Sequence, residues 1–273
     1  MDDSHDTTQP LTLLKLGGSL ITDKTHLRTR RRETLARLAN EIASAIQERP
    51  TMRLVIGHGA GSFAHVSAKL HDTRQGVSTE TQWRGFAEVW WDAATLNRLV
   101  MEALLGAGLP AIAFPPSASV TAQDGEVARW DLGPLKAALE AGLLPVIHGD
   151  VIFDIQRGGT ILSTEDLFFH LARQFQIRRM LLAGIEPGVW VDYPGRSRIV
   201  PKITPETLEE VAPALSGSVS TDVTGGMESK VKGCLLLTQE IPELEIIIFS
   251  GDESDVLRDA LLGARKGTLI CNR

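Results

Sequence analysis

The sequence is poor in cysteine and aromatic residues and has no long apolar run. It holds two cysteines, Cys234 and Cys271, in 273 residues. These are too few for a disulfide framework or a cysteine-rich metal site, which favours a reducing compartment. No stretch approaches the roughly 20 apolar residues of a membrane span. Residues 1–10 lack the apolar segment of a signal peptide, and we expect them to form a disordered tail. The sequence thus predicts a cytoplasmic protein that does not enter a membrane.

An excess of positive charge is also missing. The formal net charge is -6 at pH 7, whereas nucleic-acid binders usually carry a basic excess. A local cationic site for an anionic substrate remains compatible with this balance. The length, with 43% hydrophobic residues, allows one large α/β domain or two lobes around a substantial core.

What the sequence does contain is a regular alternation of short apolar runs and helical patterns. This alternation predicts an α/β fold with a mostly parallel central sheet and helices on both faces. We expect an N-terminal lobe over residues 11–175 and a C-terminal lobe over residues 176–273. The predicted strands are 11–16, 53–56, 111–114, 143–147, 179–183, 244–249 and 267–271, and residues 151–163 form a hairpin with its tip at 158–160. The predicted helices are 33–49, 79–107, 133–141, 167–175, 204–215 and 228–240.

The stretch from Gly57 to His65 is the most informative one. Its three glycines and one alanine follow a predicted strand, so that backbone N–H groups can approach an anion closely. If the next helix begins near Ala60, His65 lies about two turns into it and could touch a reacting phosphate. An ordinary tight turn with a surface histidine is the alternative.

Two other glycine turns accompany basic residues. Gly17, Gly18 and Ser19 follow a strand that contains Lys15, and Lys24 comes shortly after. The turn is not a Walker A motif. A lysine inside a strand is costly unless it meets an anion or reaches solvent. This turn could therefore bind phosphate.

The third turn, Thr221–Met227, precedes a helix with Lys230. Lys15, Lys24 and Lys230 could together neutralise a transferring phosphoryl group, a reaction that needs mostly positioning and charge stabilisation. Asp150, at a strand end, could orient these lysines by ion pairing, or form a simple surface salt bridge.

An aromatic stripe marks the helix predicted over residues 79–107. Trp83, Phe86 and Trp90 lie near one face in a sequence where aromatic residues are scarce. Such a stripe usually packs into the core. The alternative is that it forms the wall of an apolar substrate pocket.

Taken together and in this order, the motifs resemble those of the amino-acid kinase superfamily and, within it, the isopentenyl phosphate kinases. The resemblance runs from about Leu13 to the C-terminus. It implies an open αβα sandwich, a homodimer, an acceptor bound by the N-terminal lobe and MgATP bound by the C-terminal lobe, with Mg2+ held through the ATP phosphates. The implied reaction transfers the γ-phosphate of ATP to isopentenyl phosphate and gives isopentenyl diphosphate, a precursor of isoprenoids.

The resemblance also implies roles for individual residues. Lys24 would stabilise the transition state, Asp150 would set the lysine positions, and His65 would donate a hydrogen bond to the acceptor phosphate. The implied ATP-binding residues are Lys15, Leu16, Gly17, Gly18, Ser19, Gly61, Gly184, Gly226 and Lys230. The implied acceptor-binding residues are Gly59, Ala60, Ser62, His65 and Gly159, with Trp83, Phe86 and Trp90 around the tail.

The chain departs from the family pattern at several positions. Ala60 and Ala64 stand where glycine is usual, and Ala60 is tolerable if its φ is negative. The loop at Gly184–Trp190 lacks the aspartates that are common there, and Ser163–Asp166 replaces a Ser-Gly-Asp-Asp form while keeping the helix cap and the acidic pair.

Other functions stay open. A fosfomycin-type phosphonate kinase, or another small-molecule kinase of the superfamily, is the closest rival. A non-catalytic nucleotide sensor should have lost one of the three lysines.

Overall fold

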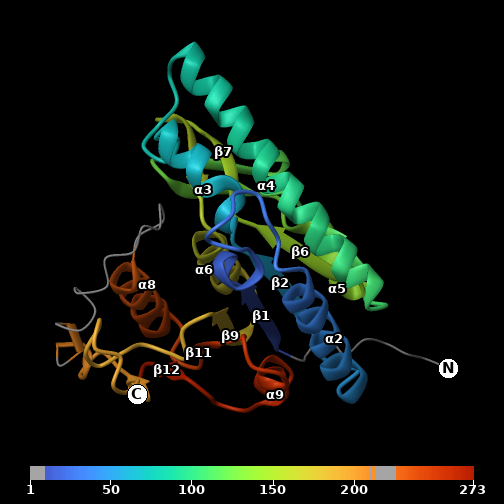
Figure 1. Cartoon of the computed structure of the whole chain (residues 1–273), viewed down its shortest axis with the longest axis vertical. Helices are drawn as coiled ribbons and strands as arrows, with labels where there is room; N and C mark the ends of the chain where they lie inside the picture. The colour runs from blue at the N-terminus through green and yellow to red at the C-terminus, as the bar shows by residue number, and fades with distance from the viewer. Residues whose placement is uncertain (1–9, 210, 213–225) are drawn as a thin grey trace.

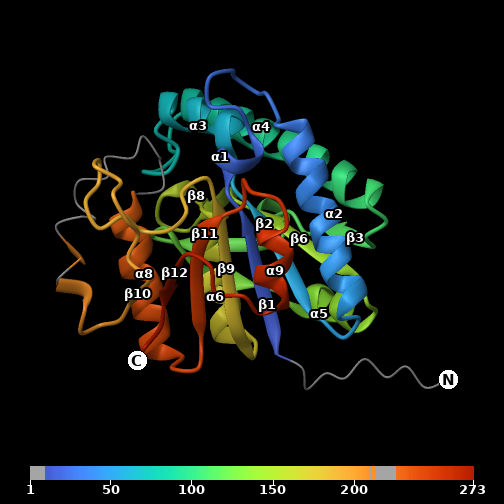
Figure 2. The same ribbon diagram turned by 60° about the horizontal axis from the view of Figure 1, so that its bottom comes forward.

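The centre of the molecule is an eight-stranded sheet with the order β10-β12-β11-β9-β1-β2-β6-β3 (Figures 1 and 2). The structure is a computed structural model that describes residues 10–209, 211–212 and 226–273. Among the described strands of this eight-stranded sheet, only β11 and β12 pair antiparallel. The strands are β1 (Leu11–Leu16), β2 (Leu54–His58), β3 (Ala111–Ala113), β6 (Leu144–His148), β9 (Ile177–Gly184), β10 (Lys202–Ile203), β11 (Glu245–Ser250) and β12 (Thr268–Ile270).

Helices cover both faces of this sheet. Successive strand residues point to opposite faces, so Leu13 packs in the core formed with α5, α6 and α8, whereas Leu14 packs in the core formed with α2, α4 and α9. The expected αβα sandwich is therefore confirmed. The helices are α1 (Gly18–Ile21), α2 (Arg32–Glu48), α3 (Gly61–Leu70), α4 (Glu80–Gly106), α5 (Gly133–Glu140), α6 (Thr164–Gln174), α8 (Met227–Glu240) and α9 (Val256–Leu262), with a short 3₁₀ helix at Pro116–Ala118.

A second, four-stranded sheet lies beside the main one. Its order is β5-β4-β7-β8, and a third apolar cluster, which includes Ala64, Phe86 and Val151, joins it to α3 and α4. The sequence pattern did not predict β4 and β5, which are short and mix polar with apolar residues. The strands are β4 (Val120–Gln123), β5 (Glu126–Trp130), β7 (Asp150–Asp154) and β8 (Gly158–Leu162).

The hairpin between β7 and β8 turns earlier than the sequence predicted. Residues 155–157 form its turn, and Gly158 already belongs to β8. The side chain of Asp154 sets this position, because Oδ1 accepts the backbone N–H groups of Gln156 and Arg157, each at 2.8 Å. The predicted tip at 158–160 is therefore wrong.

The long helix α4 begins and packs largely as its sequence predicts. The Thr79 hydroxyl accepts the N–H of Gln82, and the Gln82 side chain accepts the N–H of Thr79, which closes a capping box. The apolar stripe is buried at Val89 and Leu96 but partly exposed at Trp90, which keeps 43% of its surface.

Some expectations cannot be compared with the structure. The tail at residues 1–9 and the glycine turn at residues 221–225 lie outside the described residues, as does part of the helix predicted over 204–215. The sequence pattern did not predict β10 or α9. None of the helices in the described ranges is long and apolar enough to cross a membrane.

Candidate active site

The candidate site lies where β1, β2 and β6 end. These parallel strands are neighbours, so their carboxyl ends meet at one edge of the sheet and deliver three turns to the same place. The turns contain Gly18, Gly59 and Gly149, and all three line one cavity. The crevice at the carboxyl ends of parallel strands is the usual ligand site of open α/β sheets.

Two of the glycine turns touch each other through their backbones. A Cβ atom on Gly18 would lie 2.3 Å from the nitrogen of Gly61, and one on Gly59 would lie 2.9 Å from the nitrogen of Gly18. Gly61 also has a φ of +52°, which L side chains rarely adopt. The glycines thus allow the two turns to pack together, so the sequence motifs after β1 and β2 form a single structure.

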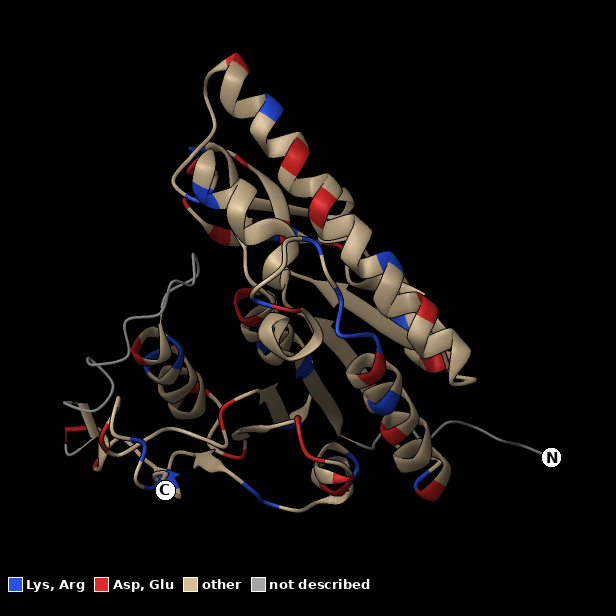
Figure 3. Cartoon of the chain, in the orientation of Figure 1, with Lys and Arg blue, Asp and Glu red and all other residues tan. Residues whose placement is uncertain are grey.

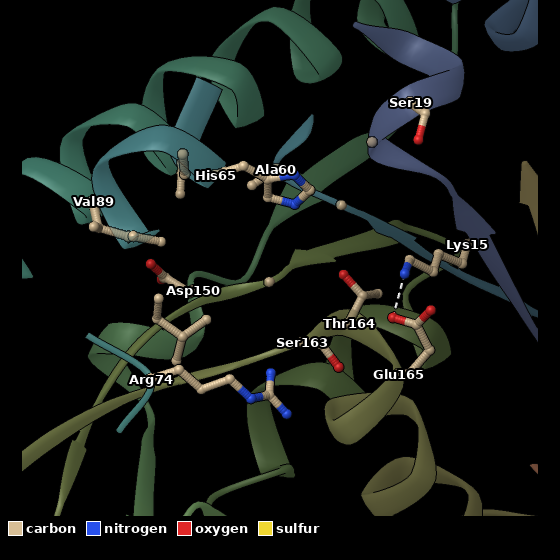
Figure 4. A pocket seen from close by; sticks show the side chains of 17 residues that line it. Lys15, Ser19, Ala60, His65, Arg74, Val89, Asp150, Ser163, Thr164 and Glu165 are labelled. Atoms are coloured by element: carbon tan, nitrogen blue, oxygen red, sulfur yellow. Dashed lines mark hydrogen bonds and ion pairs between the residues drawn. The ribbon is translucent and has the colours of Figure 1, made fainter. Parts of the chain in front are cut away.

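The N-terminal part of α3 and its N-cap residue bring His65 and Ala60 to this site. Ala60 has a φ of -79°, so its methyl group causes no backbone strain and the alanine is tolerated as expected. The helix begins at Gly61. His65 therefore lies just over one turn into the helix, and the expected two turns are wrong. Its side chain lines the cavity (Figure 4).

A buried carboxylate joins two of the predicted lysines. Lys15 of β1 donates a hydrogen bond to Glu165 of α6, and Nζ of Lys230 in α8 lies 3.3 Å from the other carboxylate oxygen. Figure 4 shows the contact between Lys15 and Glu165. Burial alone would raise the pKa of Glu165, but the charges of Lys15 and Lys230 outweigh it and lower that pKa to about 2. Glu165 is therefore ionised and fixes both ammonium groups.

The start of α6 places Glu165 accurately. Ser163 accepts the N–H of Asp166 at 3.1 Å, and the Asp166 carboxylate accepts the N–H of Ser163 at 2.8 Å, so a capping box fixes the first turn. Thr164 donates to the carbonyl of His58 at 2.6 Å and ties this turn to β2. The sequence had predicted the cap but gave Glu165 no role at the lysines.

Asp150 has different partners from those predicted. Its carboxylate accepts the N–H groups of Ser117 at 3.0 Å and Val151 at 2.9 Å, and lies 3.6 Å from Nε2 of His148. Burial raises the pKa of Asp150 to about 6, against these hydrogen bonds. Glu165 makes ion pairs with Lys15 and Lys230, whereas the side chain of Asp150 lines the same cavity, so the positioning role of Asp150 stays a prediction.

The cavity has a charged and an apolar part. Lys15, Ser19 and Ser163 lie toward the strand ends, whereas Val89 lies on the far side of the cavity from Lys15 (Figure 4). The side chains of the apolar part are small and come from α3, α4 and β8. They are Ala64, Ala68, Val89, Ala93 and Ile161.

The aromatic wall that the sequence predicted does not line this cavity. Phe86 instead packs against Gly159, whose Cβ position would lie 2.8 Å from the Phe86 ring. Trp83 contacts Phe86 and Phe153, with ring centroids 5.3 Å and 5.9 Å away. Trp83, Phe86, Trp90 and Gly159 are not among the residues that line this cavity, so the aromatic wall and the backbone contact from Gly159 to the acceptor stay predictions.

Lys24 lies on an exposed loop between α1 and α2 and not on the cavity wall. Figure 3 shows the basic character of this loop. Two ion pairs attach the loop to α4, from Arg28 to the buried Asp92 at 2.8 Å and from Arg30 to Glu102 at 2.7 Å. These ion pairs hold the loop that carries Lys24 against α4.

Seven other predicted residues do not line the cavity. Leu16 is buried in the core, so only its backbone could meet a ligand. Gly226 caps α8 four residues before Lys230, and Gly184 ends β9. The predicted residues that line the cavity are Lys15, Gly18, Ser19, Gly59, Ala60, His65 and Asp150. Those that do not, besides the aromatic residues, Gly159 and Lys24, are Leu16, Gly17, Gly61, Ser62, Gly184, Gly226 and Lys230.

Comparisons with known proteins agree with this geometry. A family model described as "Amino acid kinase family" matches residues 10–250. The isopentenyl phosphate kinase of Methanothermobacter thermautotrophicus is 34% identical over 96% of this chain and 99% of its own. That of Methanocaldococcus jannaschii is 30% identical over 95% and 98%. A solved structure titled "X-ray structures of isopentenyl phosphate kinase" superposes with a TM-score of 0.80 at 30% identity, over 95% of this chain and 99% of that one.

Proposed function

The chain belongs to the amino acid kinase family, and we propose that it transfers the γ-phosphate of ATP to isopentenyl phosphate, giving isopentenyl diphosphate. One observation carries this choice of acceptor. The cavity joins cationic and backbone N–H groups to a patch of small apolar side chains, which fits a molecule with an anionic head and a short hydrocarbon tail.

The residues would divide the reaction between two sides. Lys15 and Lys230, held by Glu165, would neutralise charge that spreads over the transferring phosphoryl group. His65 and the turn at Ala60 would hold the acceptor phosphate. Because a phosphate monoester already carries an anionic oxygen at neutral pH, His65 donates a hydrogen bond and no general base is required.

The position of Ala64, Val89 and Ala93 supports a tail that lies between α3 and α4. Small side chains leave room for a branched five-carbon group, whereas a polar phosphonate would leave this surface without a matching partner. This geometry favours isopentenyl phosphate over a fosfomycin-like acceptor.

A coupled assay of ADP release tests the proposal. Purified enzyme is given MgATP and, separately, isopentenyl phosphate, fosfomycin or UMP at equal concentrations. We expect isopentenyl phosphate to have a kcat/KM at least about 100-fold above the other two acceptors, which corresponds to about 3 kcal/mol of selectivity. Activity with fosfomycin or UMP alone would contradict the proposal.

Three further features belong to the proposal. Mg2+ would reach the site on the ATP phosphates, and titration of activity with EDTA and Mg2+ tests this. The N-terminal lobe, 11–175, would hold the acceptor, and the C-terminal lobe, 176–273, the nucleotide. The family resemblance suggests a homodimer, for which light scattering is the test, and the scarcity of cysteine suggests a cytoplasmic location, for which cell fractionation is the test.

A further inference from the structure

An arginine that the sequence motifs did not single out reaches into the cavity. Arg74 lies in the turn after α3, and its side chain is among those that line the cavity (Figure 4). The backbone carbonyl of Arg74 accepts the hydroxyl of Thr160 in β8 at 2.9 Å and the guanidinium of Arg157, in the turn before β8, at 3.4 Å. The side chain therefore extends from an anchored point.

The guanidinium of Arg74 has one satisfied side and one unsatisfied side. Nη2 donates to Asp166 at 3.2 Å. Nη1 is buried and finds no hydrogen-bond partner among the described residues. A buried donor that lacks an acceptor costs about 1–3 kcal/mol, and more when it is charged. The site thus holds a cationic donor that an anionic ligand could satisfy.

The carboxylate of Asp166 explains how Arg74 is held. The same oxygen, Oδ2, accepts the N–H of Ser163 within the capping box of α6. The acid therefore positions one edge of the guanidinium and leaves the other edge for the cavity. Planar guanidinium groups fixed in this way are well suited to phosphate oxygens.

We propose that Arg74 is a further acceptor-binding residue, which donates from Nη1 to a non-bridging oxygen of the phosphate that His65 also contacts. This inference rests on the proposed function and extends it. Lys15 and Lys230 share Glu165 and are assigned to the transferring phosphoryl group, so an acceptor dianion needs a further cationic donor, and Arg74 supplies one within the same cavity.

Two substitutions and a matched control test the role of Arg74. Arg74→Gln removes the positive charge, and Arg74→Lys keeps the charge but lacks the planar guanidinium group. Arg84→Gln is the control, because Arg84 forms an exposed ion pair with Glu80 at 2.7 Å and does not line the cavity. KM and kcat are measured for isopentenyl phosphate and for ATP. Calorimetry measures binding of isopentenyl phosphate and of n-butyl phosphate, and thermal melting checks folding.

We expect Arg74→Gln to weaken binding of both phosphate esters and to raise the acceptor KM by about 10- to 100-fold, the range for a lost charged hydrogen bond. The ATP KM should change less than about twofold, and Arg74→Lys should be intermediate. Arg84→Gln should match the wild type. An unchanged acceptor KM and affinity in folded Arg74→Gln would overturn the inference. So would an equal rise in the ATP KM, since that result indicates only support of α6 through Asp166.

The measurements also separate this inference from the proposed function. If the wild type binds n-butyl phosphate in an Arg74-dependent way but does not phosphorylate isopentenyl phosphate, the proposed substrate is wrong and the role of Arg74 is upheld. If the wild type and Arg74→Gln phosphorylate isopentenyl phosphate equally well, the inference fails and the proposed function stands.

Discussion

Replacing Glu165 by glutamine removes one negative charge from between two lysines. The amide keeps the shape of the side chain, but Lys15 and Lys230 lose their common counter-ion. The pKa of Glu165 falls from its ordinary 4.5 to about 2 in the folded protein. At 1.36 kcal/mol per unit, this shift corresponds to roughly 3 kcal/mol of stability at neutral pH. Breaking a buried ion pair at one partner costs about 3–5 kcal/mol, which agrees.

We therefore expect Glu165→Gln to lower the free energy of unfolding at pH 7 by about 3 kcal/mol. The folded-state pKa of Glu165 is lowered, so its contribution is complete above the unfolded value of 4.5 and is lost as the pH falls toward about 2. The difference between wild type and variant should shrink over that range. Urea titrations at pH 7 and pH 3 measure it.

The control for Glu165→Gln is Glu240→Gln. Glu240 forms an exposed ion pair with Arg173 at 2.6 Å, and such pairs contribute about 1 kcal/mol or less. This control should change stability little at either pH.

Turnover should respond to Glu165→Gln as well, because displaced ammonium groups stabilise the transition state poorly. Loss of one positioned donor lowers kcat by about 100- to 1,000-fold. A variant within about threefold of the wild-type kcat and about 0.5 kcal/mol of its stability would refute the reasoning, since neither result is compatible with a charge that holds both lysines.

Three other substitutions address the rest of the site. His65→Ala should lower kcat/KM for the acceptor by about 100-fold and leave ATP affinity within about twofold, because His65 lies on the acceptor side. A large loss of ATP affinity in calorimetry would show that the acceptor side and the nucleotide side are assigned wrongly. Ala93→Leu should raise the acceptor KM by about 10-fold, because the larger side chain fills the apolar part of the cavity. Trp90→Ala should leave the preference for tail length unchanged. Kinetics with longer prenyl phosphates would expose an error in either expectation. The pKa of Asp150 is raised from 3.8 to about 6, so the wild type loses stability when this group ionises over that range of pH. Asp150→Asn should therefore gain about 2 kcal/mol of stability relative to the wild type as the pH rises from about 4 to 8. Thermal melts that show the opposite trend would contradict the assigned pKa.

Local sequence patterns predicted most of the main sheet. The strand at residues 11–16 is buried on both faces and flanked by a glycine turn, so its apolar pattern is clear. The strands β4 and β5 were missed because they are short and mix polar with apolar residues. They also lie outside the main sheet, since β4 pairs with β7 and β5 pairs with β4.

The site was predictable where its residues lie within a motif. Gly18, Gly59 and His65 belong to turns whose chemistry is visible in a few consecutive residues. Glu165 and Arg74 were missed because their roles depend on contacts between distant segments. Glu165 meets Lys15 across 150 residues, and Arg74 meets Asp166 across 92.

The aromatic stripe shows a different limit of sequence patterns. Helical spacing indicates that Trp83, Phe86 and Val89 lie near one another on α4. It does not indicate where along the helix the cavity lies. Phe153 of the β7–β8 hairpin packs against Trp83 and Phe86, while Val89, one turn further, reaches the cavity.

The most direct test of the account is identification of the product by ³¹P NMR. The wild-type enzyme is incubated with MgATP and isopentenyl phosphate, and the spectrum is followed as ADP accumulates. The account predicts that the single resonance of the monophosphate is replaced by two mutually coupled resonances of a diphosphate ester, in step with ADP. Release of ADP with inorganic phosphate alone, or an unchanged monophosphate resonance, would contradict it.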